Sequence, residues 1–466
     1  MLFHPQCVKE KEGAFSFSDV QNVVCHPCLS GEVFREFWHN FCFSASSLQC
    51  QVTNDYRFSL GNITPPSAEG YAYAIKITPL GICITANDEA GLRLGFMTLL
   101  DRIYARDGDN GMTLALDCCE IYESPLVEYR MVHFCIFPET ELWELQRFLR
   151  LSAALRYSHV IVEFWGMLQF DCMQELAWKH RFRKEEVSPI LKEARELGLE
   201  IIPMFNHWGH ASGSRVLHGK HVVLDQNPAL QTYFSEDGWC WDITKPKVKA
   251  LLTRIRDELC ALCGEGDFFH IGCDEAYNFD FTEAHMGDIC DYINEVCLQM
   301  KESGRRVIVW GDMFLAQHPA YKGKNYICGA PRPDAEAYML SHITRDVVIA
   351  DWQYYATEAP VETALLFQKE GFDTLLCPWD LSASRVKSCV ATVKQHQLMG
   401  LMHTTWHTLS KGMPFVILSA LGCFENIDTT DELNTKTAAL LRKVCPVGGD
   451  YHMAGWGKCE VGTRLD

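Results

Sequence analysis

The sequence FFHIGCDEAY, which spans Phe268–Tyr277, decides the fold of this chain. Its first four residues are strand-like and mostly apolar, and a glycine, two adjacent carboxylates and an aromatic residue follow. A buried strand that presents acids just past its carboxyl end is how an α/β barrel builds an active site. Asp274 and Glu275 repel each other, so we expect the pKa of at least one to rise toward a value useful for proton transfer. The alternative is a strand-to-helix loop whose acids only cap the next helix.

Strands alternate with helices from Tyr129 onward, which is the pattern of a parallel sheet. Strands are predicted at Tyr129–Phe137, His159–Phe164, Leu199–Phe205, Phe268–Gly272, Arg305–Asp312, Asp346–Gln353, Asp373–Asp380 and Gly400–Thr408. Amphipathic helices are predicted between them, for example Glu141–Leu155, Lys184–Leu197, Pro246–Cys263 and Ser384–Gln397. Eight such units predict an α/β protein with a (β/α)8 TIM barrel over residues 123–443. The connection Asn206–Lys245 exceeds ordinary loop lengths, which suggests a lid or substrate loop.

Residues 1–122 are predicted to form a small non-catalytic α+β domain that precedes the barrel in the sequence. Residues 71–77 and 82–86 alternate as a hairpin around a turn at 78–81, and Asn87-Asp88-Glu89-Ala90 caps a helix over Leu92–Ile103. No catalytic residue is expected there. Residues 444–466 form a C-terminal tail to which the sequence assigns no role.

Composition narrows the class of protein. The formal net charge of -18 over 466 residues argues against nucleic acid as a partner, because no basic surplus is present to neutralise phosphates. No apolar run reaches the length that crosses a bilayer, and the first residues lack a secretory signal pattern. The 22 cysteines then read as reduced thiols, mostly buried, which predicts a cytoplasmic location. Cys25-His26-Pro27-Cys28 has no second ligand pair at zinc-binding spacing, so neither a metal nor a cofactor is expected.

Polar and aromatic residues recur where the predicted strands end, and in a barrel these ends converge on one mouth. They are Glu163, Trp165, Asn206, His207, His210, Asp274, Glu275, Trp310, Asp312, Asp351, Trp352, Tyr354, Tyr355, Trp379, Asp380, Trp406 and His407. Tryptophan faces stack on pyranose rings, while acids and histidines bond hydroxyls. Any single Trp is explained as well by the bulky core of a barrel. Taken together with the carboxylate pair, the set predicts a sugar pocket.

The residues around this pair resemble glycoside hydrolase family 20, the β-N-acetylhexosaminidases. Phe269–Glu275 is similar to the family's His-x-Gly-x-Asp-Glu signature, and Trp241–Pro246 is similar to the segment that leads into the preceding helix. Ile202–His210 resembles the family's Pro-Gly-His strand end. The hairpin with Asn87–Gly95 resembles the family's non-catalytic N-terminal domain. The resemblance covers most of the chain and is closest in detail to the intracellular hexosaminidase D-like branch and its bacterial relatives.

The resemblance implies a retaining, metal-independent hydrolase that removes terminal β-linked N-acetylhexosamine with the substrate's own acetamido oxygen as nucleophile. It implies that Glu275 is the general acid/base and that Asp274 orients the acetamido group and stabilises an oxazolinium intermediate. His210 matches the family histidine that helps to set the proton balance; a core histidine is the alternative. The substrate-binding residues expected from the strand ends are Glu163, Trp165, His210, Trp310, Trp352, Tyr354, Tyr355, Trp379, Asp380, Trp406 and His407.

The chain departs from the family where the sugar would be held. Phe137-Pro138 stands in place of the family's sugar-binding Arg, and Arg130 is expected to be structural. Asp380 follows Pro378-Trp379 where the family has its acetamido-binding Tyr, which leaves Tyr354 or Tyr355 as the substitute. Two rival functions stay open: a sugar-binding protein without hydrolysis, and a glycosidase with Glu163 or Asp380 as nucleophile. The expected partner is a carbohydrate, and self-association stays open because no interface signal is present.

Overall fold

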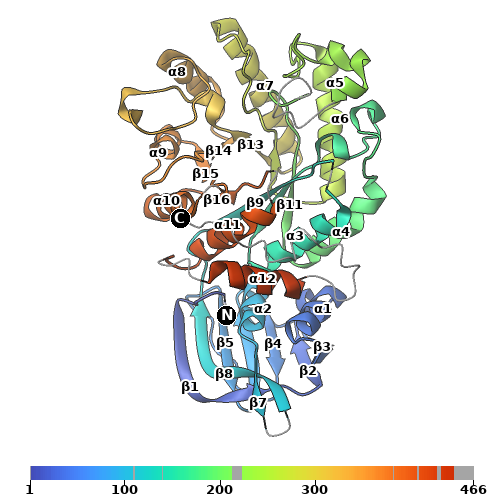
Figure 1. Ribbon diagram of the computed structural model, residues 1–466, viewed down its shortest axis with the longest axis vertical. Helices are drawn as coiled ribbons and strands as arrows, with labels where there is room; N and C mark the ends of the chain where they lie inside the picture. The colour runs from blue at the N-terminus through green and yellow to red at the C-terminus, as the bar shows by residue number, and fades with distance from the viewer. Residues whose placement is uncertain are drawn as a thin grey trace.

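The computed structural model describes residues 2–108, 111–138, 140–212, 223–380, 382–406, 409–427 and 432–444. An N-terminal sheet with two helices lies below a barrel surrounded by helices (Figure 1). The predicted fold class is confirmed: a closed parallel barrel follows a smaller α+β unit.

Eight parallel strands close the barrel in the order β9 to β16. They are β9 Tyr129–Cys135, β10 His159–Glu163, β11 Glu200–Met204, β12 Phe268–His270, β13 Arg306–Trp310, β14 Val348–Asp351, β15 Asp373–Leu376 and β16 Gly400–His403. Each lies inside its predicted range and is shorter, because the last predicted residues have already turned into the loops of the mouth. Apolar side chains such as Met131, Ile202, Ile308 and Val348 fill the barrel interior, as a packed core and not a pore.

Helices cover the outside of the barrel. They are α3 Leu142–Ala154, α4 Lys184–Glu196, α6 Pro246–Cys263, α7 Glu283–Glu302, α8 Pro333–His342, α9 Glu362–Lys369, α10 Ala383–His396 and α11 Leu409–Gly422. The predicted helices at α3, α4, α6 and α10 are confirmed to within two residues. A short α5, Val223–Gln226, lies in the long connection after β11, and α12, Leu433–Val444, lies between the barrel and the N-terminal domain (Figure 1).

The N-terminal domain is a sheet with strand order β1-β8-β5-β6-β4-β2-β3, in which β7 also pairs with β8. Its elements are β1 Cys7–Ser16, β2 Val20–Cys25, α1 Glu32–Phe41, β3 Ser47–Val52, β4 Arg57–Leu60, β5 Tyr73–Thr78, β6 Gly81–Ala86, α2 Glu89–Asp101, β7 Tyr104–Gly108 and β8 Gly111–Glu123. The predicted hairpin is β5–β6, and the predicted cap is Asp88, which accepts a hydrogen bond from the Gly91 N–H at 2.7 Å. Trp38, Phe58 and Phe96 join the helices to the sheet.

A buried ion pair connects the two parts. Glu123 at the end of β8 accepts hydrogen bonds from Arg156, which follows α3, and from Tyr73 of β5. The rings of Phe3 and Phe424 lie 3.6 Å and 3.8 Å from the Arg156 guanidinium carbon. Since both charges are fully buried, removal of one partner would leave the other uncompensated.

Residues 445–466, nearly all of the unassigned tail, lie outside the described part of the chain.

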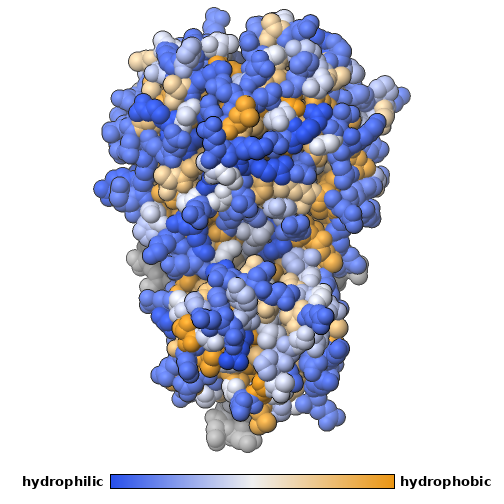
Figure 2. Space-filling model, turned by 180° about the vertical axis from the view of Figure 1, so that it is seen from behind, coloured by the Kyte–Doolittle hydropathy of each residue, from blue (hydrophilic) through white to orange (hydrophobic). Residues whose placement is uncertain are grey.

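The surface seen from behind is mostly hydrophilic, with small apolar patches separated by polar residues (Figure 2). None of the described helices combines the length and the apolar character needed to cross a bilayer.

The cysteines of the described residues are free thiols, and many, such as Cys263, Cys377 and Cys389, lie in the core. The interaction with Cys50 on the neighbouring strand β3, together with burial, raises the pKa of Cys25 of the CxxC sequence.

Candidate active site

The acidic loop after β12 has an unusual backbone. Gly272, Cys273 and Glu275 have φ angles of +66°, +75° and +49°, so two residues with side chains occupy the left-handed region. Such strain persists where the surroundings hold the chain, and it gathers at functional sites. Here the neighbouring strands hold it: the N–H of Trp310 donates to the Gly272 carbonyl at 2.9 Å, and a methyl group on Gly272 would lie 1.6 Å from Asn206 Oδ1. The loop therefore presents Asp274 and Glu275 in a fixed orientation.

His210 joins the two carboxylates. Its Nε2 lies 2.8 Å from Glu275 Oε2 and 3.4 Å from Asp274 Oδ2. His210 and Asp274 are buried, while 26% of the Glu275 side chain is exposed. The three groups can share and pass a proton, with Glu275 as the member open to solvent. The predicted grouping of His210 with the acid pair is thus present in the structure.

The same three side chains are the one group among the described residues whose ligand atoms, all within 4.8 Å of one another, could hold a metal ion. The oxygen and nitrogen donors suit a divalent cation such as Zn²⁺ or Mn²⁺. Exposed acidic groups are common without such an ion. The geometry alone therefore permits a proton-sharing trio or a cation site, and a chelator distinguishes them.

Asp312, just past β13, supports the acidic loop by hydrogen bonds. Its Oδ2 accepts the Glu275 backbone N–H at 2.9 Å, and its Oδ1 accepts Trp352 Nε1 at 3.0 Å. Burial raises the pKa of Asp312 to about 7, the two hydrogen bonds lower it, and the charge of Glu275 raises it further. The strand-end pattern included Asp312, but the predicted substrate-binding set did not.

Two aromatic residues outside the predicted set of site residues cover the other side of the acidic loop. Trp239 donates its Nε1 hydrogen to the Glu275 carbonyl, and its ring lies 4.5 Å from that of His210. Tyr277 stacks on Trp239 at 5.3 Å, and burial and a hydrogen bond with Glu275 raise its pKa. Trp239 comes from the long connection after β11, which was predicted to be a lid or substrate loop. Residues 213–222 of that connection lie outside the described residues. The described part of the connection packs on the acidic loop.

An aromatic wall forms across the mouth from the ends of β14, β15 and β16. Trp406 Nε1 donates to the Tyr354 hydroxyl at 2.9 Å, and the Tyr354 ring lies 5.0 Å from Trp352 and 5.2 Å from Trp379. Burial raises the pKa of Tyr354, and the charge of Asp274 contributes in the same direction. The structure therefore brings four of the predicted residues together: Trp352, Tyr354, Trp379 and Trp406. Tyr354 among them is close enough to Asp274 for its charge to affect the tyrosine pKa.

The remaining predicted residues lie deeper or elsewhere. Glu163 is fully buried, its oxygens bonded to His133 Nε2 at 3.0 Å and Asn206 Nδ2 at 3.3 Å. Trp310 and Trp165 are also buried, and Trp165 stacks beside His210 at 6.4 Å. Three further residues complete the predicted set: Tyr355 is 48% exposed outside the aromatic wall, Asp380 lies half-buried beside α11, and His407 lies outside the described residues.

Two neighbours of the predicted set have structural contacts. Arg130 donates to the backbone carbonyls of Val127, Glu128 and Arg156, so its predicted structural role fits its position. The carboxylate of Asp351 faces away from the mouth and accepts a hydrogen bond from Thr363 of α9 at 2.6 Å. Among the described residues, the acids grouped with His210 at the mouth therefore come from the ends of β12 and β13.

The fold has counterparts among solved structures. A GH20 exo-β-N-acetylglucosaminidase from Vibrio harveyi, solved with N-acetylglucosamine, aligns over 95% of this chain and 77% of its own, with 15% identity and a TM-score of 0.67. A β-N-acetylhexosaminidase from Bacteroides fragilis aligns over 93% of both chains, with 15% identity and a TM-score of 0.66. A lacto-N-biosidase from Bifidobacterium bifidum is 23% identical over 188 residues, which are 36% of this chain and 16% of that protein.

The matched family model starts only after β10. The first two barrel strands, with His133 and Glu163, therefore lie outside it. The match continues through β16 and includes the acidic loop, His210 and the aromatic wall. Because the model of the glycosyl hydrolase family 20 catalytic domain matches residues 165–407, more than half of the sequence, the chain belongs to that family.

Proposed function

We propose that this protein is a glycoside hydrolase that removes terminal β-linked N-acetylhexosamine with retention of configuration. The observation that carries the proposal is the pair of Asp274 and Glu275 on one strained loop, with His210 from the connection after β11 within 3.4 Å of Asp274 and 2.8 Å of Glu275. Ordinary retaining glycosidases place two carboxyl groups on opposite sides of the sugar. Adjacent acids on one loop cannot flank a sugar in this way, so the nucleophile is proposed to come from the substrate.

Each acid has a distinct role in the proposed reaction. Glu275 gives its proton to the glycosidic oxygen as the bond from that oxygen to C1 breaks and the acetamido oxygen bonds to C1. Buried Asp274 accepts the acetamido N–H and stabilises the positive charge of the oxazolinium ion. Water then attacks C1, Glu275 takes its proton, and the acetamido group is restored. The proton thus returns to Glu275 in each cycle.

The aromatic wall is proposed to hold the sugar. Trp352, Trp379 and Trp406 supply flat apolar faces for the ring, and the Tyr354 hydroxyl supplies a polar group for the acetamido oxygen. Tyr354 is favoured over Tyr355 because its ring contacts two of these tryptophans and its hydroxyl contacts the third.

Release of chromophore from aryl β-glycosides tests the proposal, with N-acetylglucosamine, N-acetylgalactosamine, glucose and galactose as the sugars. We expect turnover of the acetamido sugars alone, at least 100-fold slower in Glu275→Gln, and unchanged by a chelator. Equal turnover of glucose and galactose would instead support a nucleophile from the protein. Glu163 is poorly placed for that role, since it is fully buried and bonded to His133 and Asn206. Binding of the acetamido sugars without turnover would support a non-hydrolytic binding protein.

We also propose a cytoplasmic location for the enzyme. Many of its thiols lie in the packed core, as Cys263, Cys377 and Cys389 do, which suits a reducing compartment. Fractionation of the source cells tests this proposal. Recovery of the protein with secreted or vesicular material would contradict it.

A further inference from the structure

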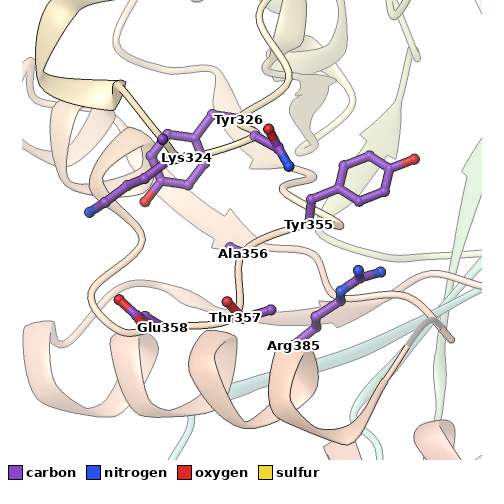
Figure 3. Close-up of a pocket in the computed structure, with 9 residues that line it drawn as sticks. Lys324, Tyr326, Tyr355, Ala356, Thr357, Glu358 and Arg385 are labelled. Atoms are coloured by element: carbon purple, nitrogen blue, oxygen red, sulfur yellow. The ribbon is translucent and has the colours of Figure 1, made fainter.

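A second pocket lies on the carboxyl-terminal face of the barrel beside the aromatic wall. Its volume is about 310 Å³, and two strand-to-helix connections and the first turn of α10 line it. The connection after β13 supplies Lys324–Tyr326, the connection after β14 supplies Tyr355–Glu358, and α10 supplies Arg385 (Figure 3). Tyr354 belongs to the aromatic wall and Tyr355 to this pocket, so the pocket begins one residue away from the mouth.

Among the described residues, Arg385 is the basic side chain of the pocket that makes no ion pair. Its Nε is buried without a hydrogen-bond partner among these residues. Its guanidinium carbon lies 5.2 Å from the centre of the Tyr355 ring. Lys324, by contrast, is bonded to Glu362 at 2.7 Å, and Glu358 is exposed on the far side of the pocket (Figure 3). Burial of Nε without a hydrogen-bond partner has an energetic cost, and the exposed part of the guanidinium is free to bind an anion that a ligand supplies.

Tyr355 gives the pocket a flat surface for stacking. Its side chain is 48% exposed although it carries a large ring, and Figure 3 shows this ring above the Arg385 side chain. Aromatic faces stack on sugar rings, and the guanidinium fork matches the oxygens of a carboxylate or sulfate with paired hydrogen bonds. An exposed ring beside an unpaired arginine is therefore suited to a sugar that carries an acidic group.

We propose that this pocket binds an anionic sugar residue, bearing a carboxylate or a sulfate, of the glycan whose terminal N-acetylhexosamine enters the barrel mouth. The proposal rests on the proposed function, because it assigns the pocket to the same substrate. It makes Arg385 and Tyr355 specificity residues for the part of the glycan that is released. Tyr355 thereby contacts substrate outside the aromatic wall.

The test compares substrates that differ in one group. N-acetylhexosamine is linked β to glucuronate, to glucose 6-sulfate or to glucose, and kcat/KM is measured for the wild type, Arg385→Gln and Lys387→Gln. Lys387 lies on the same helix but does not line the pocket, so it controls for the lost charge. We expect the wild type and Lys387→Gln to favour an anionic substrate about tenfold or more, and Arg385→Gln to lose that preference. The anionic substrate with the higher kcat/KM shows whether the pocket prefers a carboxylate or a sulfate.

Equal kcat/KM on all three substrates, or a preference that survives in Arg385→Gln, would overturn the proposal. Turnover of an aryl N-acetylhexosaminide, which has no second sugar, reports the proposed function separately. If no glycoside is cleaved, binding of methyl β-glucuronide, of methyl β-glucoside 6-sulfate and of methyl β-glucoside is followed by ligand-observed NMR. Binding of either anionic sugar that Arg385→Gln loses supports the pocket, and equal binding by the two proteins, or none, contradicts it.

Discussion

Replacement of Asp312 by Asn tests how the acidic loop is held. The Asp312 carboxylate accepts two hydrogen bonds, from the Glu275 N–H at 2.9 Å and from Trp352 Nε1 at 3.0 Å. An amide has one oxygen and one NH2 group, so in the variant one of these donors faces another donor. The shape of the side chain is nearly unchanged. The variant therefore removes one buried hydrogen bond and the negative charge without opening a cavity.

The loss of that hydrogen bond costs about 1–3 kcal/mol, because a buried donor is left unsatisfied. Glu275 has a left-handed backbone, with φ at +49°. The lost hydrogen bond is one of the interactions that hold Glu275 in this strained conformation, so its loss lets the general acid leave its position. A factor of ten corresponds to about 1.4 kcal/mol. We therefore expect kcat/KM for aryl N-acetylhexosaminides to fall about five- to 150-fold in Asp312→Asn.

The pH profile separates this role from a general loss of stability. The charge of Glu275 raises the pKa of Asp312, and such coupling acts equally in the other direction. Removal of the Asp312 charge should therefore move the alkaline limb of kcat/KM to lower pH. Asp351→Asn is the matched control, because Asp351 is also buried and accepts from Thr363 and Gln353, on the side away from the mouth. The reasoning is refuted if Asp312→Asn and Asp351→Asn have equal activity and the same pH profile.

Three further predictions concern the packing and titration of other groups. Gly209→Ala places a methyl group 1.9 Å from the Asp274 carbonyl oxygen, so we expect at least a 100-fold loss of kcat/KM with an unchanged circular dichroism spectrum; activity near that of the wild type would contradict the packing. The interaction with Cys25 and the nearby Arg35 lower the pKa of Cys50 to about 7. Mass mapping should therefore find Cys50 alkylated by iodoacetamide before the other described cysteines at pH 7.5. Alkylation of Cys50 together with or after the other cysteines would contradict this. Burial raises the pKa of Asp351 to about 6, against about 3.9 in unfolded chains, so its contribution to stability is present below about pH 4 and is lost as the pH rises through 6. The thermal unfolding midpoint should therefore depend less on pH between 4 and 7 in Asp351→Asn, and an unchanged dependence would contradict this.

The barrel could be predicted because its signal is local. Each strand is a short apolar run, buried on both faces, and each is followed by an amphipathic helix, so sequence order alone gives the strand order of a parallel barrel. The acid pair could be found for the same reason, since Asp274 and Glu275 directly follow such a run. Strand ends were predicted one to five residues too late, because the loops of the mouth continue the apolar pattern.

The support of the acid pair could not be predicted, because it depends on contacts between distant segments. Trp239 reaches the Glu275 carbonyl from a long connection without helical or strand periodicity. Tyr354 and Tyr355 are equivalent in the sequence, and only the exact end of β14 decides which one faces the tryptophans. Glu163 was placed correctly at a strand end, but its depth in the barrel follows from its contact with His133 on the first strand.

The central claim, that the acetamido oxygen of the substrate is the nucleophile, is tested most directly by changing that oxygen alone. Aryl glycosides that carry acetyl, fluoroacetyl, difluoroacetyl or trifluoroacetyl groups on the C2 nitrogen form a series of decreasing amide nucleophilicity. Their kcat/KM values are measured with the wild-type enzyme. The account predicts a steep fall with every added fluorine. A flat series would contradict it and would mean that a group of the protein attacks C1.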